Sequence, residues 1–338
     1  MDALVCEKPG TFEYKTLAAP ELEPGHAILR IRRIGICGTD LHAFEGTQPY
    51  FSYPRILGHE LAAELVDADG TNDFVKGEVL TFIPYFSCGK CIACRKGKPN
   101  CCTGIKVSGV HIDGGMVTYF KVPVESLLKS KGLSYDELAL VEPLSIGAHA
   151  VRRAQVSSGE YVLVTGAGPI GLATMKFAQI AGAKIIALDV NDYRLDFCKH
   201  HLGVLHTINP GTQNAMELLT EITNGDMPDV VMDATGNLHA INKAFEYMSH
   251  GGKYVLVGLQ RDTIQLSHPE FHKREGTLLS SRNATRDDFE FVIDCIQQKL
   301  VDPEAFITHR VQFHEVKDIF PSWLNPSSRL IKAVVEMV

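Results

Sequence analysis

The chain has 338 residues, 45% of them hydrophobic, which suits two globular domains with apolar cores. Its 33 basic and 40 acidic residues give a net charge of −7, which argues against a nucleic-acid partner or an anionic membrane surface. No apolar run approaches the roughly 18 residues of a membrane span, and residues 1–15 lack the apolar core of a signal peptide. Nine cysteines without an export signal indicate a reducing compartment, and we expect the cytoplasm.

The first part of the chain predicts an irregular, mostly antiparallel β-domain. Apolar or alternating runs are separated by Pro-Gly, Asp-Gly and Gly-Gly pairs, which is typical of short strands joined by turns. The expected strands are 27–34, 64–66, 79–83 and 119–122.

From Tyr161 onward, strands and helices alternate, which predicts a parallel sheet of βαβ units. The expected strands are 161–165, 184–188, 230–233, 254–257 and 277–280, and the expected helices are 170–181, 194–201, 215–223 and 240–248. A helix from Thr285 to about residue 299 and an apolar run at 330–335 close the chain. We therefore expect a nucleotide-binding domain at 149–281, inserted into a second domain formed by 1–148 and completed by 282–338.

Four closely spaced cysteines predict a metal-binding loop: Cys88, Cys91, Cys94 and Cys102, with the pattern C-x2-C-x2-C-x7-C. This spacing allows four thiolates to converge on one tetrahedral Zn²⁺. Free or disulfide-bonded cysteines are the alternative interpretation. Cys101 could compete as the fourth ligand, but the spacing favours Cys102.

A glycine-rich turn follows the strand at 161–165 and opens an apolar helix; it reads Gly166-Ala167-Gly168-Pro169-Ile170-Gly171. In this context it predicts a dinucleotide site with the pyrophosphate at the helix N-terminus. Asp189 ends the next strand, where a carboxylate accepts ribose hydroxyls and repels a 2′-phosphate, so NAD is favoured over NADP. Arg194 could pair with a phosphate and keeps NADP as the alternative. Further candidate cofactor contacts are Thr235, Gly236, Val257 and Gly258.

Three more segments carry ligand chemistry: Gly35-Ile36-Cys37-Gly38-Thr39-Asp40-Leu41-His42, Gly58-His59-Glu60 and Glu142-Pro143-Leu144. A single Cys or His is more often buried for structural reasons than bound to a metal. Together with the cysteine loop and the glycine-rich turn, however, these segments resemble the zinc-dependent medium-chain dehydrogenases/reductases, in order and over the whole chain. The resemblance implies an α/β chain with a GroES-like β-rich catalytic domain and a Rossmann NAD-binding domain. It also implies two zinc ions per chain, one of them structural and held by the four cysteines.

The resemblance assigns roles around the second, catalytic zinc. Cys37 and His59 match the two ligands that the family shares, while Glu60 and Glu142 match carboxylates that complete the coordination sphere or exchange with water. Whether Glu60, Glu142 or water does so stays open. Thr39 and His42 match a proton relay, and Asp40 matches the acid that orients the ligand histidine. A zinc with an open position lowers the pKa of an alcohol and stabilises the alkoxide from which hydride leaves.

Other segments resemble the polyol dehydrogenases and, more closely, bacterial L-galactonate and L-gulonate 5-dehydrogenases. They are 142–150, 46–60 with Tyr50, 270–273 and 282–285. The resemblance implies that NAD oxidises a secondary alcohol of a sugar acid to the keto acid, with Arg282 and Asn283 as substrate-binding candidates. A surface role is the alternative for Arg282. The alternative substrates are another polyol or threonine, and a non-catalytic nucleotide sensor is a remote alternative. We expect a small-molecule substrate and a homo-oligomer, either dimer or tetramer.

Overall fold

The computed structural model describes residues 1–49 and 51–337 and divides into two compact units. We call Met1–Glu142 with Thr285–Val338 the outer unit, and Pro143–Ala284 the inserted unit. The units divide at 142/143 and 284/285, whereas the sequence suggested 148/149 and 281/282. Helix α4 (Val141–Ala154) runs across the first of these boundaries, so no loop marks the division there.

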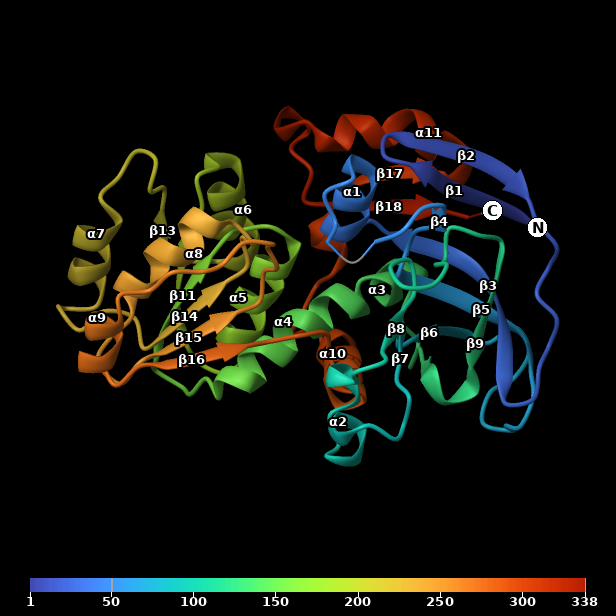
Figure 1. The fold of residues 1–338 in the computed structure, drawn as a ribbon, viewed down its shortest axis with the longest axis horizontal. Helices are drawn as coiled ribbons and strands as arrows, with labels where there is room; N and C mark the ends of the chain where they lie inside the picture. Colours follow the sequence, from blue (N-terminus) through green and yellow to red (C-terminus); the bar gives the residue numbers. More distant parts are fainter. Residues whose placement is uncertain (50, 338) are drawn as a thin grey trace. The chain divides into compact units, whose positions relative to one another are not determined.

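The outer unit consists mainly of antiparallel β-sheet (Figure 1). One sheet has the order β2-β1-β4, with β1 (Asp2–Lys8), β2 (Thr11–Thr16) and β4 (Arg55–Ile56). The largest sheet has the order β10-β6-β5-β3-β18-β17, with β9 added on β3. Its strands are β3 (His26–Gly35), β5 (Glu60–Ala68), β6 (Val79–Phe82), β9 (Tyr119–Pro123), β10 (Leu127–Lys129), β17 (Ile307–Gln312) and β18 (Lys332–Glu336). The pair β7 (Tyr85–Phe86) and β8 (Lys106–Val107) forms the base of the cysteine loop.

The helices of the outer unit are short apart from one. They are α1 (Gly38–Glu45), α2 (Ile92–Arg95), α3 (Tyr135–Ala139), α10 (Arg286–Gln297) and α11 (Val316–Ile319), with 3₁₀ turns at Pro99–Cys101, Val124–Ser126, Glu304–Phe306, Phe313–Glu315, Phe320–Leu324 and Pro326–Ser328. Thr285 caps α10, as its position before an apolar-periodic segment predicted.

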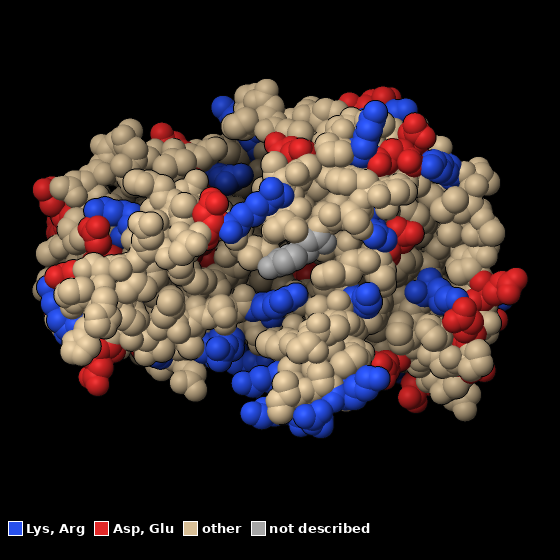
Figure 2. Space-filling model, viewed as in Figure 1, with Lys and Arg blue, Asp and Glu red and all other residues tan. Residues whose placement is uncertain are grey.

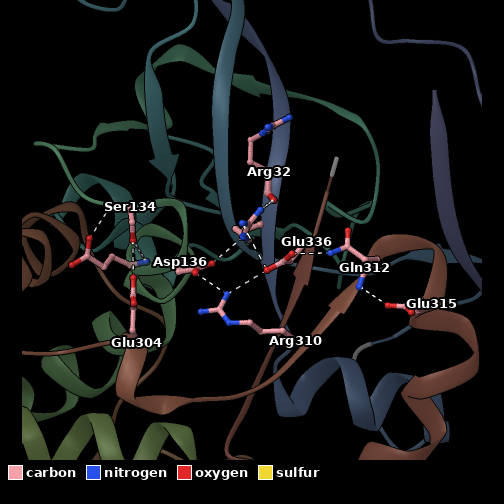
Figure 3. A network of polar contacts seen from close by, with 10 residues as sticks. Arg32, Ser134, Asp136, Glu304, Arg310, Gln312, Glu315 and Glu336 are labelled. Carbon is pink, nitrogen blue, oxygen red and sulfur yellow. Dashed lines mark hydrogen bonds and ion pairs between the residues drawn. The ribbon is translucent and has the colours of Figure 1, made fainter.

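The C-terminal segment completes the outer unit. Strand β18 pairs antiparallel with β3, so that Val334 lies opposite Gly35. A polar network joins the same elements: Asp136 of α3 accepts from Arg33 Nε at 2.9 Å and contacts Arg310 Nη1 at 2.7 Å, and Arg310 also reaches Glu336 (Figure 3). Phe12, Phe44 and Phe320 pack ring against ring in the core of this unit. The two ends of the chain therefore share one core.

The inserted unit is built on a six-stranded, fully parallel sheet of order β13-β12-β11-β14-β15-β16 (Figure 1). Its strands are β11 (Tyr161–Thr165), β12 (Lys184–Leu188), β13 (His206–Ile208), β14 (Val230–Asp233), β15 (Lys253–Leu256) and β16 (Thr277–Ser280). Besides α4, its helices are α5 (Pro169–Ile180), α6 (Asp192–Leu202), α7 (Ala215–Ile222), α8 (Leu238–Ala244) and α9 (His268–Lys273). The strand order reverses at β11, which creates the crevice where open α/β sheets bind ligands.

The expected fold class is confirmed: an antiparallel β-rich part and a parallel βαβ sheet. The helix expected at 240–248 ends earlier, because α8 stops at Ala244 and a 3₁₀ turn at Phe245–Tyr247 follows. Strands β1, β2 and β13 and helix α4 were not predicted. None of the helices in the described part of the chain combines the length and apolar character that crossing a membrane requires.

Candidate catalytic and cofactor sites

Two paired strands bring three potential metal ligands together in the outer unit. Cys37 follows β3 and precedes α1, while His59 and Glu60 stand at the start of β5. Because β3 and β5 pair antiparallel with Gly35 opposite Glu60, the end of one strand meets the beginning of the other. The ligand atoms of Cys37, His59 and Glu60 all lie within 4.8 Å of one another. A Cβ at Gly35 would lie 2.1 Å from Glu60 Oε2, so only glycine leaves room for this carboxylate.

Asp40 holds both ligand-bearing segments in place. Its fully buried carboxylate accepts the backbone N–H of Cys37 at 2.9 Å and that of Gly58 at 3.2 Å. Its Oδ1 also lies 3.9 Å from His59 Nδ1. Burial raises the pKa of Asp40. The carboxylate therefore fixes the backbone next to Cys37 and next to His59.

The donors around this point fit a zinc ion. A thiol, an imidazole and a carboxylate are the side chains that bind Zn²⁺ in proteins. His59 Nδ1 is buried and has no hydrogen-bond partner. Burial acts to lower the pKa of His59, but the negative charges of Cys37 and Asp40 outweigh it and raise the pKa well above its ordinary value. The cluster thus attracts positive charge, and a metal ion would replace a proton there.

Lys332, which the sequence did not single out, is the partner of Glu60. Its ammonium donates to both carboxylate oxygens of Glu60 at 2.7 Å and to the carbonyl of Ile36 at 3.0 Å. Both side chains are buried, with exposed fractions of 2% and 0%. A buried lysine in an apolar strand needs such a partner. The sequence indicated this ion pair only through the presence of a lysine in the otherwise apolar run around β18.

Glu142 is held by Tyr85, a second residue that the sequence did not reveal. Glu142 lies in the first turn of α4, is 5% exposed, and accepts a hydrogen bond from the Tyr85 hydroxyl at Oε1. Burial raises the pKa of Glu142 to about 7. Burial and the charge of Glu142 raise the pKa of Tyr85 well above its ordinary value, so the phenol keeps the proton that it donates. Among the described residues, the ligand group within 4.8 Å does not include Glu142.

Thr39 and His42 lie on α1, directly after Cys37. They are three residues apart, which places them on one face of the helix. Thr39 is half-buried and His42 is exposed. The pair therefore leads from the buried cluster toward solvent.

The structure also brings together the four cysteines of the loop. The sulfur atoms of Cys88, Cys91, Cys94 and Cys102 lie within 4.8 Å of one another, whereas Cys101 is exposed and outside the group. The backbone N–H groups of Cys88 and Gly104 donate to Cys102 Sγ at 3.2 and 3.4 Å. Hydrogen bonds from the backbone N–H groups of Cys94 and Thr103 lower the pKa of Cys91 to about 5. Burial raises the pKa of Cys94 to about 11. The set fits a tetrathiolate zinc site whose formation releases protons.

Five exposed cations surround this cysteine lobe, by which we mean residues 88–102. Figure 2 shows basic side chains gathered where Figure 1 labels α2; the exposed basic residues in this part of the chain are Lys90, Arg95, Lys96, Lys98 and Lys106. No acidic residue occurs between Glu78 and Asp113. These cations would offset the excess negative charge of four thiolates around one Zn²⁺.

The glycine-rich turn of the inserted unit is shaped for close backbone approach. Gly166 adopts φ +91°, and a Cβ at Gly171 would lie 1.8 Å from the Gly166 carbonyl oxygen. Helix α5 therefore begins directly against the end of β11, with Pro169 and Ile170 in its first turn. Such a helix N-terminus presents unpaired N–H groups to a pyrophosphate.

Asp189 connects the end of β12 to this turn. It accepts the backbone N–H of Ala167 at 2.6 Å and that of Asn191 at 2.8 Å, which leaves lone pairs for ribose hydroxyls. The guanidinium of Arg194 would lie 3.9 Å from a Cβ at Gly168, so this side chain reaches the glycine-rich turn.

Asp233, at the end of β14, organises the other candidate cofactor contacts and was missed in the sequence. Its buried carboxylate accepts from Thr235 Oγ1 at 2.6 Å and from the backbone of Gly236 at 3.2 Å. Its carbonyl accepts from the N–H groups of Val257 and Gly258. The structure thus joins the loops that follow β14 and β15 through one acid.

The substrate-binding candidates lie just after β16 in the inserted unit. Arg282 is exposed, and Asn283 is half-buried with φ +50°. The structure does not place them relative to the ligand cluster of the outer unit. Tyr50 lies outside the described residues.

Comparisons with known proteins agree with this geometry. Residues 23–132 match the family model "Alcohol dehydrogenase GroES-like domain", and residues 169–298 match "Zinc-binding dehydrogenase". The chain is 40% identical to the L-galactonate-5-dehydrogenase of Escherichia coli (strain K12), over 99% of this chain and 98% of that protein. It is 29% identical to the sorbitol dehydrogenase of Bacillus subtilis (strain 168), over 99% and 97%.

A solved structure shows the same fold. The crystal structure of an alcohol dehydrogenase from Escherichia coli CFT073 with NADH superimposes with a TM-score of 0.93 at 29% identity and covers 99% of each chain.

Proposed function

This chain belongs to the zinc-type medium-chain alcohol and polyol dehydrogenases, and from that premise we propose that it oxidises a secondary alcohol of a sugar acid with NAD. The observation that carries the chemistry is the group of half-buried Cys37 with buried His59 and Glu60 in the same chain as a glycine-rich dinucleotide turn. Zinc and NAD are the cofactors.

Separate residues bind the metal and transfer the proton. Cys37 and His59 would hold the zinc, with Glu60, Glu142 or water completing its coordination sphere, and the metal would supply a Lewis acid that lowers the pKa of the substrate hydroxyl. The Thr39 hydroxyl accepts a hydrogen bond from the substrate hydroxyl and, as it receives that proton, passes its own proton along the relay. His42 releases a proton to solvent from the exposed end of the same helical face.

The cofactor contacts lie at the carboxyl ends of the parallel strands. The turn Gly166–Gly171 binds the pyrophosphate, and the free lone pairs of Asp189 accept the ribose hydroxyls. The backbone N–H groups of Ala167 and Asn191 hold the Asp189 carboxylate in place, and a carboxylate at this position would repel the 2′-phosphate of NADP.

The sugar-acid substrate is supported by the 40% identity to an L-galactonate-5-dehydrogenase and by one cation in the chain. Arg282 is an exposed arginine directly after the last parallel strand, near the edge where such sheets bind ligands. A planar guanidinium binds a carboxylate through two parallel hydrogen bonds. An uncharged hexitol is the second candidate substrate, because a sorbitol dehydrogenase matches nearly the whole chain.

The substitution Arg282→Ala tests the role of this cation. The KM for L-galactonate should rise about 10- to 100-fold, since a lost charge-assisted hydrogen bond costs roughly 1.5–3 kcal/mol. The KM for the matched uncharged galactitol should change little, and Arg282→Lys should restore only part of the loss. An equal change for both substrates would remove Arg282 from carboxylate recognition.

We further propose a homo-oligomer, dimer or tetramer, because most soluble oligomers are symmetric assemblies of one chain. Light scattering of the purified protein gives its mass directly, and a mass of one chain would contradict this proposal.

A further inference from the structure

Tyr85 stands between the cysteine lobe and the ligand cluster of the outer unit. It begins β7, three residues before Cys88, and pairs with Val107 of β8. Its ring packs, together with Cys91 and Cys94 of the lobe, against a buried apolar cluster of Cys102, Ile105, Val107 and Val110. On another side the ring meets Phe289 of α10 edge to face, with the centroids 6.0 Å apart. The position of the ring is therefore set by the lobe and by α10.

The hydroxyl of this ring donates to Glu142 Oε1. The carboxylates of Glu60 and Glu142 are thus held by different chemistry. Glu60 receives a cation, Lys332, which cancels its charge. Glu142 receives a neutral phenol, which fixes the orientation of the carboxyl group without adding a positive charge beside it.

We propose that Tyr85 is a positioning residue that orients the Glu142 carboxylate toward the catalytic metal and makes this orientation depend on the cysteine lobe. The inference rests on the proposed function, because it requires a metal bound by Cys37 and His59. The lobe would then support catalysis directly, in addition to stabilising the fold. Partners that orient the residues around a metal typically change metal affinity or activity by about 10- to 100-fold when they are removed.

The first test uses Tyr85→Phe, which removes the hydroxyl and keeps the ring between the lobe and Phe289. The matched control is Tyr135→Phe, because Tyr135 donates to Glu64 in the same unit and is part of neither metal site. Protein with Co²⁺ in the catalytic site and Zn²⁺ in the lobe is examined by visible spectroscopy and by release of Co²⁺ to a chelator. We expect Tyr85→Phe to change the d–d bands and to release Co²⁺ about 10- to 100-fold faster. Tyr135→Phe should match the wild type in both measurements.

Spectra and release rates of Tyr85→Phe that equal those of the wild type would overturn the positioning role. If instead the wild-type protein shows no thiolate-to-Co²⁺ band that disappears in Cys37→Ser, the proposed function itself fails. The two failures are therefore distinguishable. Because the spectra report metal geometry, a general loss of stability that leaves the site intact would not produce the expected change.

The second test addresses the link to the lobe. Replacing the lobe Zn²⁺ with Cd²⁺, a larger ion that also prefers thiolates, changes the geometry of the cysteine loop. We expect this exchange to alter the Co²⁺ spectrum of the wild type but not that of Tyr85→Phe, in which the connection is absent. A wild-type spectrum that does not respond to the lobe metal would overturn the link.

Discussion

Replacing Lys332 with methionine should destabilise the outer unit strongly. Its ammonium donates to both oxygens of Glu60 at 2.7 Å, and neither side chain reaches solvent. Removal of one partner from a buried ion pair leaves an uncompensated charge and costs about 3–5 kcal/mol. The free energy of unfolding should therefore fall by about this amount in metal-free Lys332→Met. Adding Glu60→Gln should recover part of the loss, because the buried charge is then gone.

Urea unfolding followed by tryptophan fluorescence measures this effect in the relevant unit. Trp323 is the single tryptophan of the chain and is buried in the outer unit. Lys121→Met serves as the control, since its partner Glu23 is largely exposed and such surface pairs contribute about 0–1 kcal/mol. A buried ion pair is ruled out if Lys332→Met loses no more stability than Lys121→Met. It is also ruled out if the double variant loses the sum of the unfolding free energies lost by Lys332→Met and by Glu60→Gln.

The other predictions concern metal, cofactor and proton transfer. Freshly purified protein should contain about two zinc ions per chain and Cys37→Ser about one; metal analysis that finds one ion in both would remove the catalytic site. The wild type should have a higher kcat/KM with NAD than with NADP, and Asp189→Ser should make the two values more similar. Equal values for the wild type would contradict the role of Asp189. Thr39→Val should lower kcat about 10²-fold or more while the zinc content stays unchanged. His42→Ala should lower kcat less, and stronger buffer bases should restore part of it. A variant that loses zinc but keeps the wild-type kcat would contradict a role in proton transfer. Glu142 has a pKa of about 7, and His59, whose pKa lies well above its ordinary value, must also release a proton when a metal binds. The Co²⁺ affinity of the catalytic site should therefore rise with pH through about 7 and keep rising above it; affinity that falls with rising pH in a titration would contradict this.

Local features of the chain were predicted from the sequence because neighbouring residues determine them. The cysteine spacing alone indicated the metal loop, and the strands of the inserted unit followed from short apolar runs between helical segments. The glycine-rich turn was recognisable for the same reason, since its strand, turn and helix are contiguous. Helix α4 was not predicted; its Pro143 lies in the first turn, where proline is well tolerated.

Contacts between distant segments were not predicted. Lys332 and Glu60 are 272 residues apart, and Tyr85 and Glu142 are 57 residues apart, so no spacing rule connects them. The pairing of β3 with β5 and β18 creates the first contact, and the position of β7 relative to α4 creates the second. A lysine within an apolar strand indicates that a buried partner exists, but only the folded structure identifies it.

The most direct test of the proposed function compares one matched pair of substrates. The zinc-loaded wild-type protein is given NAD with L-galactonate or with galactitol, and kcat/KM is measured from NADH absorbance. L-galactonate should have the higher kcat/KM, by about 10-fold or more, because a charge-assisted pair binds its carboxylate. A kcat/KM for galactitol that equals or exceeds that for L-galactonate would contradict the sugar-acid proposal and favour a general polyol dehydrogenase.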